Sequence, residues 1–261
     1  MKKAVPFLLL VILAVAAWYF FLKPTAPVIE SPVQAVVPVE PDSRDLPPPT
    51  VSDVIEPEFE TEPVIPPEPL PVLSESDPEV MQALGDIANE ESLSQYLVMD
   101  QVISRAVASI DSLTSRQVPV HINPITSAKG AFLVDKEGED LVLSPRNFAR
   151  YDDYVALLQQ MDAGSLVSFY GRYAPLFQEA WEQNGGLGSF DERMIEVIDN
   201  LLETPDVPGP VYLTKPEAVY VFEDPNLEAM TAGQKVLVRM GSVNATVVKQ
   251  KLAEVKAILD Q

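Results

Sequence analysis

Cysteine is absent from the 261-residue chain, and histidine occurs once, as His121. Without cysteine the chain forms no disulfide and offers no thiolate ligand, so its fold must be held by the core alone. With a single histidine, a Ser-His-Asp arrangement, a Cys-His pair and a two-histidine zinc site are impossible or strained from the start. The Gly-x-Ser-x-Gly, His-Glu-x-x-His and P-loop lysine motifs are also missing. We therefore expect no catalytic residue, cofactor or metal, and we expect His121 to be a surface or packing residue.

Positive charge is scarce, because 18 lysines and arginines face 39 acidic residues and leave a net charge of −21. A protein that binds nucleic acid needs a basic surface that neutralises phosphates. An anionic lipid surface attracts basic segments for the same reason. The composition therefore argues against a nucleic-acid partner and against a domain that lies flat on the membrane.

Residues 4–22 form an unbroken run of nineteen uncharged, almost wholly apolar residues, with Lys2 and Lys3 before it and Lys23 after it. A run of this length crosses a bilayer as a helix, and the preceding lysines keep residues 1–3 in the cytoplasm. We expect a single-pass inner-membrane protein whose later residues are periplasmic. The alternative is a signal peptide cleaved after the small residues 15–17, but the apolar run continues past that point.

Glycine is missing from residues 24–73, which contain fourteen prolines, ten acidic residues and one basic residue, Arg44. Proline blocks helix and sheet, and the acidic residues repel one another. We therefore predict a disordered linker over residues 23–73. It acts either as a semi-rigid spacer that holds a domain away from the membrane or as a solvating tether.

Residues 74–261 form the predicted periplasmic domain, since aromatic and periodic aliphatic residues return there. Apolar residues at helical spacing predict a mainly helical domain with a small β element, an α+β fold. The predicted helices start near Ser76 and then cover residues 97–113, 144–161, 166–181 with a kink or break at Pro175, 189–203, 234–240 and 243–259.

Strands are predicted in two places. Residues 131–134 and 141–143 flank a polar, glycine-containing segment and predict a β-hairpin with its tip at residues 135–140. Residues 211–213 and 218–222 predict two more short strands. Residues 118–122 alternate but lie among prolines, so they form an edge strand at best.

Arginine precedes tyrosine twice, as Arg150–Tyr151 and as Arg172–Tyr173. These residues are candidates for binding an external carboxylate or a sugar. Alternatively, both arginines pair internally with the neighbouring aspartates 152–153, which such an acidic domain favours.

A second candidate surface is the basic C-terminal segment, from which Lys235 and Arg239 are the predicted binding residues. This segment contains Lys235, Arg239, Lys249, Lys251 and Lys256. It either docks on the acidic face of the domain's own helix 189–203 or forms a partner surface.

Acidic residues offer weaker candidates for chemistry. Four of them recur at helical spacing in residues 189–203 and are expected to form a solvated face rather than a metal site: Glu192, Glu196, Asp199 and Glu203. Glu179 and Glu182, on a helix that also carries aromatic residues, are the best pair for an alternative function, the hydrolysis of envelope polymers by paired carboxylates. A small-ligand carrier is a further alternative, which an apolar pocket would favour.

Four strings resemble a proteobacterial family, the Domain of Unknown Function 3014: residues 143–154 (LSPRNFARYDDY), 175–180 (PLFQEA), 198–205 (IDNLLETP) and 232–241 (AGQKVLVRMG). The resemblance runs through most of residues 70–260, and the anchor and spacer also look like that family's layout. It implies an envelope protein without an assigned biochemical role and supplies no catalytic residue. We expect a non-catalytic interaction or binding domain, with an envelope protein or peptidoglycan as its partner.

Overall fold

The computed structural model describes residues 69–88, 90–116, 124, 130–217 and 219–260. The predicted membrane helix of residues 4–22, most of the predicted linker, His121 and the predicted edge strand lie outside these residues. Of the helices that the structure does describe, none is both long and apolar enough to span a membrane. The described residues form helices and a four-stranded antiparallel sheet, which confirms the α+β fold expected of this region.

The described part begins with a short 3-10 turn, η1 (Leu73–Glu75), followed by α2 (Asp77–Ile87), α3 (Glu90–Tyr96) and α4 (Val102–Ser112). Helix α2 starts where the sequence predicts, with a proline in its first turn. The single predicted helix over residues 97–113 is wrong in its first five residues. The chain leaves helical geometry there, and Gln101 adopts a left-handed φ of 53°.

A side chain from α2 explains this break. The two carboxylate oxygens of Asp77 accept hydrogen bonds from the backbone N–H groups of Gln101, at 2.7 Å, and Val102, at 2.9 Å. These N–H groups belong to the start of α4, where no intrahelical acceptor exists. Asp77 therefore caps α4 from 25 residues away, an arrangement that local sequence does not reveal.

Replacing Asp77 with alanine is expected to lower the free energy of unfolding by about 1–2 kcal/mol, the usual cost of a lost helix cap. Denaturant titration of the two proteins measures the difference. Asp86→Ala, an exposed site on the same helix, is the control and should change stability far less. Equal losses at both sites would contradict the capping role.

The middle of the domain contains η3 (Pro145–Arg150), α5 (Asp152–Gln160), α6 (Ala163–Gln183) and α7 (Phe190–Leu202). Helix α6 continues through Pro175, so the predicted break is absent. It ends as expected at consecutive glycines. Gly185 has a φ of +83°, and the N–H groups of Gly185 and Gly186 donate to the carbonyls of Glu182 and Trp181. Ser189 then caps α7, as predicted.

Asp162 caps the start of α6 and makes stability depend on pH. Hydrogen bonds from the backbone and hydroxyl of Ser165 hold the pKa of this carboxyl below its usual 3.8. Because the pKa is lower in the folded state, the carboxylate stabilises the fold above the unfolded pKa, and this contribution is lost as pH falls through the folded pKa. We expect the stability gap between wild type and Asp162→Asn to narrow when unfolding is measured from pH 6 down to pH 3. A stability difference that stays constant over this pH range would contradict the lowered pKa of Asp162.

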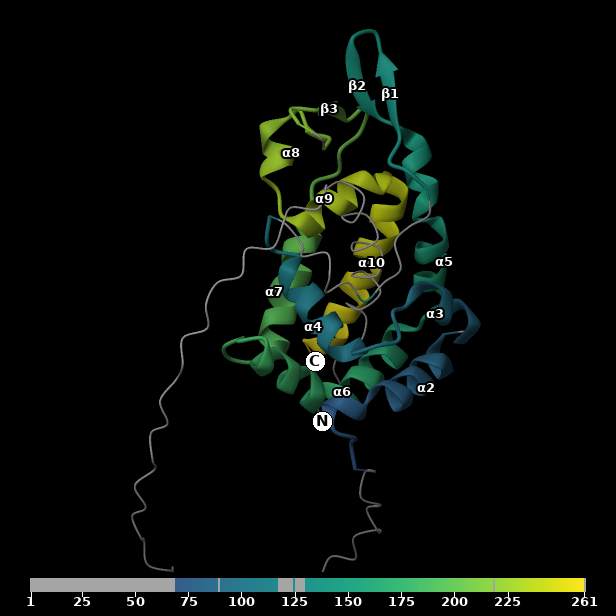
Figure 1. Cartoon of the computed structure of the whole chain (residues 1–261), viewed down its shortest axis with the longest axis vertical. Coiled ribbons are helices and arrows are strands. Elements are labelled where there is room, and N and C mark those ends of the chain that lie inside the picture. Colours follow the sequence, from purple (N-terminus) through teal and green to yellow (C-terminus); the bar gives the residue numbers. More distant parts are fainter. Residues whose placement is uncertain (1–68, 89, 117–123, 125–129, 218, 261) are drawn as a thin grey trace, which may run out of the picture. The chain divides into compact units, whose positions relative to one another are not determined.

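The C-terminal part contains α8 (Pro225–Ala229), which the sequence did not predict, α9 (Ala232–Arg239) and α10 (Gly241–Leu259). Helix α10 contacts α5, α6, α7 and α9, and Figure 1 shows it in the middle of the helices. Its inward residues Val248, Leu252 and Val255 are completely buried. The main hydrophobic core therefore surrounds α10.

The sheet contains β1 (Val134–Glu137), β2 (Asp140–Leu143), β3 (Tyr212–Thr214) and β4 (Val221–Phe222), in that order. Both predicted strand pairs occur, but the first strand is displaced, because β1 begins at Val134, the last residue of the predicted strand 131–134. The hairpin turn is therefore shorter than expected. Strand β1 extends to Glu137, which pairs with Asp140. The β1–β2 hairpin projects at one end of the described helices (Figure 1).

A second, smaller core joins the sheet to the helices. Leu143, Leu213 and Phe222 of the sheet are buried in one cluster with Val238 of α9. Side chains that alternate with them along the strands point to the other face of the sheet. Tyr212, between buried Val211 and Leu213, is accordingly 40 % exposed.

Candidate functional site

Arg172 and Tyr173, on α6, form an internal contact with α2. The Arg172 guanidinium lies 3.0 Å from a carboxylate oxygen of Glu79, and the Tyr173 hydroxyl donates to the same oxygen at 3.0 Å. The hydrogen bond from Arg172 to Glu79 raises the pKa of Arg172. The internal pairing that the acidic composition favours does occur for Arg172, but with Glu79 instead of aspartates 152–153.

Arg150 and Tyr151 lie where η3 meets α5. The Tyr151 side chain is completely buried, and desolvation raises the pKa of its hydroxyl. The Arg150 guanidinium donates to the backbone carbonyl of Gly130 at 3.2 Å. Nearby Asn147 bonds both backbone groups of Leu133. This region therefore anchors the chain that enters β1.

Lys235 and Arg239 connect α9 to α8 and the sheet. Lys235 Nζ lies 2.5 Å from one carboxylate oxygen of Glu228, whose other oxygen accepts from the Phe222 backbone N–H at 2.9 Å. The Arg239 guanidinium lies over the Phe222 ring, 4.4 Å from its centroid. Burial lowers the pKa of Arg239 because desolvation penalises its charge.

The other lysines of the basic C-terminal segment also contact the domain itself. Lys249 donates to the Thr204 carbonyl at 2.6 Å, Lys251 donates to the Met161 carbonyl at 3.1 Å, and Lys256 pairs with Asp199 on α7. All three lysines contact the domain itself, but only Lys256 contacts the acidic helix 189–203. A partner surface at this segment stays a prediction.

Four of the six predicted binding residues are buried: Tyr151, Tyr173, Lys235 and Arg239. Their binding role stays a prediction, and their burial argues against direct contact with a partner. Arg150 and Arg172 remain half-buried. The structure does not bring the six together in one site.

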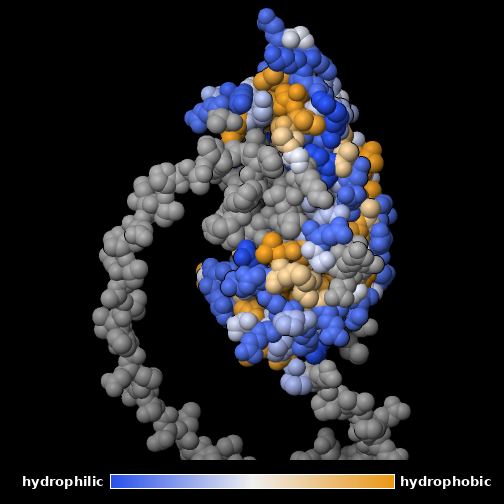
Figure 2. Space-filling view, turned by 45° about the vertical axis from the view of Figure 1, so that its right-hand side comes forward, coloured by the Kyte–Doolittle hydropathy of each residue, from blue (hydrophilic) through white to orange (hydrophobic). Residues whose placement is uncertain are grey.

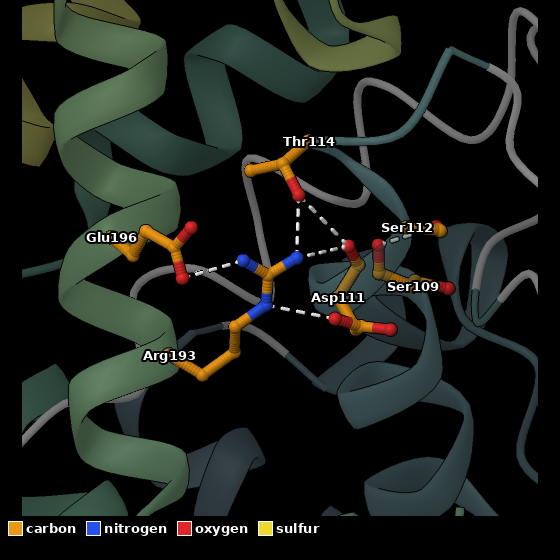
Figure 3. Close-up of polar contacts among 6 residues, drawn as sticks. All are labelled: Ser109, Asp111, Ser112, Thr114, Arg193 and Glu196. Carbon is orange, nitrogen blue, oxygen red and sulfur yellow. Dashed lines mark hydrogen bonds and ion pairs between the residues drawn. The ribbon is translucent and has the colours of Figure 1, made fainter. Parts of the chain in front are cut away.

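The acidic face of α7 is also partly engaged by the domain. Arg193 of α7 contacts Glu196 at 2.6 Å and bonds the Asp111 carboxylate of α4 at 2.8 Å (Figure 3). It also bonds the hydroxyl of Thr114, in the turn after α4, at 2.5 Å. This arginine therefore links α7 to α4 by hydrogen bonds and an ion pair. Within the described ranges, no three or more histidines, aspartates or glutamates are grouped to hold a metal ion.

Glu179 and Glu182, the candidate catalytic pair, are exposed on α6. Each accepts a hydrogen bond from a glutamine one turn away on the same helix, Gln183 for Glu179 and Gln178 for Glu182. The aromatic residues of α6 are buried on the opposite side, so they do not form a cleft with these carboxylates. The hydrolase alternative gains no support from this geometry.

A groove of about 520 Å³ opens beside the sheet. Strands β2 and β3, the loop before β3, and the start of α8 contribute to it. Its lining residues are Asp140, Val207, Pro210, Val211, Tyr212, Glu223, Asp224 and Leu227. Its volume lies within the range of ligand-binding sites. Figure 2 shows this sheet end of the domain, with hydrophobic surface just beneath the hairpin tip and hydrophilic residues around it.

The polar lining of this groove, which we call the acidic groove, has one sign of charge. Asp140, Glu223 and Asp224 are all exposed, and among the described residues that line the groove there is no lysine or arginine. Asp224 accepts from the Asn226 N–H at 2.8 Å as the cap of α8. The side chains of Asp140 and Glu223 make no hydrogen bond or ion pair with other described residues, so both are available to a partner.

Val207 and Pro210, from the loop of residues 204–210, form part of the wall of the acidic groove. Residues 204–207 also line a smaller hollow of about 110 Å³ with residues of α9 and α10, so Val207 lines both. The Val211 carbonyl bonds the Leu143 N–H at 2.9 Å, which ties the end of this loop to β2. The wall is thus fixed to the sheet where the groove begins.

Sequence reasoning missed the acidic groove. Its residues come from separate segments around positions 140, 207–212 and 223–227, and none of these segments shows a motif. One usable signal exists, because Tyr212 occupies the outward position between two inward aliphatic residues, directly after a proline-rich loop.

The comparisons with known proteins identify a family but no characterised relative. No curated protein and no solved structure shows a significant match to the chain. The family model described as "Protein of unknown function (DUF3014)" matches residues 102–256, which include the sheet, the acidic groove and most of α10. The chain belongs to this family of proteins of unknown function.

Proposed function

We propose that this protein is a membrane-anchored envelope protein whose domain binds a partner through the acidic groove and catalyses no reaction. The apolar run of residues 4–22 supports the anchor, and the proline-rich residues 23–73 support a spacer that lets the domain reach a partner away from the membrane. An envelope protein is the partner that this arrangement favours, and peptidoglycan is the other candidate.

The proposal that the acidic groove binds the partner rests on a difference in exposure between the groove and the residues predicted from the sequence. The arginine, lysine and tyrosine residues that looked available in the sequence are buried or contact the domain itself. In the acidic groove, by comparison, Tyr212 is 40 % exposed beside two carboxylates that have no partner among the described residues. Tyrosine is enriched in protein–protein interfaces, whose rims are polar.

The location is tested by fusing a reporter that is active only in the periplasm after Gln261. We expect activity from this fusion, and none from the same reporter when residues 4–22 are deleted. Activity of a cytoplasm-specific reporter at Gln261 would overturn the proposed topology.

Binding at the acidic groove is tested by photocrosslinking of the full chain in the cells that make it. The crosslinking amino acid benzoylphenylalanine replaces Tyr212 in one strain and Leu187, which is 90 % exposed in the α6–α7 loop, in the control strain. We expect a discrete product of defined mass from position 212 and none from position 187. Identical products from both positions, or none from either, would contradict a specific site at the groove.

The same experiment addresses the small-ligand alternative, which the volume of the groove supports. A carrier would give a crosslinked product only slightly heavier than the chain. A protein partner would add many kilodaltons, and a peptidoglycan fragment would be sensitive to muramidase digestion.

A further inference from the structure

We infer that the acidic groove recognises a basic segment of a partner polypeptide, in which lysine or arginine lies next to an aliphatic residue. The inference rests on the proposed role of the groove as the binding site and adds the chemistry of its partner. It is carried by the arrangement of charge, aromatic ring and apolar surface within one concave site.

Carboxylates flank the exposed ring of Tyr212 from both neighbouring strands. Asp140 begins β2, Glu223 and Asp224 follow β4, and β3 with Tyr212 lies between these strands. The Glu223 backbone N–H donates to the Tyr212 carbonyl at 3.0 Å, which holds Glu223 beside this tyrosine. A cation over the ring would gain cation–π attraction and charge-assisted hydrogen bonds together.

The remaining lining suits the carbon stem of a basic side chain. Val207, Val211 and Leu227 contribute aliphatic surface within the same groove. Lysine and arginine bury their methylene groups along apolar surface while the charged end remains near polar groups. An aliphatic neighbour in the partner would use the rest of this surface.

The carboxylates of the acidic groove also argue against ligands other than a basic polypeptide segment. Nucleic acid, anionic lipid and other negatively charged ligands would be repelled by these carboxylates, since the part of the chain that the structure describes places no basic residue in the lining. A metal ion is disfavoured too, because Asp224 is committed to capping α8 and the described residues contain no metal-binding group. A basic polypeptide segment is the occupant that satisfies both the charge and the apolar lining.

The test measures peptide binding to the full chain in nanodiscs of neutral lipid, by fluorescence anisotropy. The probe is an eight-residue labelled peptide that alternates lysine with valine, and the matched peptide has glutamine in place of lysine. The groove variant carries Asp140→Asn and Glu223→Gln. The control variant carries Asp86→Asn and Glu192→Gln, which remove the same charges from exposed sites on α2 and α7.

We expect the lysine peptide to bind about tenfold or more tightly than the glutamine peptide at low salt, with the preference falling as salt is added. The groove variant should bind the lysine peptide about threefold to tenfold more weakly, and the control variant should bind like wild type. Tyr212→Leu should also weaken binding of the lysine peptide, because the ring is lost and the apolar surface is kept.

Equal losses in the groove and control variants would overturn the inference, because general attraction to an acidic protein would then explain binding. Absence of lysine-peptide binding, together with a crosslinked product at position 212, would overturn the basic partner and leave the groove as the binding site. A crosslinked product of twice the chain mass would identify a second copy as the occupant and overturn the inference as well.

Discussion

Replacing Phe177 with alanine is expected to lower the free energy of unfolding by about 3–5 kcal/mol, the usual range for a large aromatic residue in a closely packed core. Phe177 is 1 % exposed on α6, with its ring centroid 5.0 Å from that of Tyr170 and 5.9 Å from that of Phe190. Truncation leaves a cavity between α6 and α7 that the two neighbouring rings cannot fill. Denaturant unfolding followed by near-ultraviolet circular dichroism measures the loss.

Tyr212→Ala is the control for this prediction. Tyr212 is exposed, so its truncation should change stability by less than about 0.5 kcal/mol. The same variant shows that the groove can be altered without unfolding the domain. A small effect at Phe177 would contradict the placement of the aromatic cluster in the core.

Gly241→Ala is expected to cost about 2–4 kcal/mol, because two penalties act at one position. Gly241 lies two residues after the end of α9, as the first residue of α10, and has a φ of +81°, a conformation in which a side chain is strained. An added Cβ would also lie 2.8 Å from the Phe148 ring, which is too close for a real contact. Thermal unfolding of the variant measures the combined cost.

Gly185→Ala separates the two penalties. Gly185 has nearly the same φ, +83°, but no described atom beyond its own residue and its chain neighbours lies within 4 Å of the position of its Cβ. Gly185→Ala should therefore lower the free energy of unfolding by about 1–2 kcal/mol, which is the cost of the backbone conformation alone. Phe148→Leu in the Gly241→Ala background should recover part of the remaining loss. Equal costs at the two glycines would show that the predicted contact with Phe148 is relieved at no cost.

The sequence predicted helices and strands best where a local signal exists. The apolar face of α7 and its Ser189 cap, the glycine stops after α6 and α9, and the pairing of β1 with β2 all follow from spacing and turn chemistry. The extension of one helix through residues 97–101 was wrong because Asp77, far away in sequence, caps α4 at Gln101.

Pro175 also shows that distant packing can override a local signal, here by continuing a helix instead of ending one. A proline inside a helix removes one backbone hydrogen bond, which predicts a break. Helix α6 nevertheless continues, because its apolar face is buried on both sides of the proline, with Tyr170 and Tyr173 before it and Phe177 and Trp181 after it. Packing outweighs the local penalty.

Charged residues were the hardest to interpret, since sequence does not show which charges meet. Arg172 contacts Glu79, 93 residues away, and Lys256 contacts Asp199, 57 residues away. Residues that looked available for binding are therefore used in packing. The acidic groove could not be predicted for the same reason, because only the fold brings Asp140 close to Glu223.

Carboxyl footprinting of the unmodified protein is the most direct test of the claim that the acidic groove is the binding surface. A carbodiimide reagent labels exposed carboxylates in native membranes and in the purified chain, and mass spectrometry compares Asp140 and Glu223 with Glu192 on α7. We predict that Asp140 and Glu223 are protected in native membranes relative to the purified chain, while Glu192 is labelled equally in both. Equal labelling of all three residues in both samples would contradict the claim.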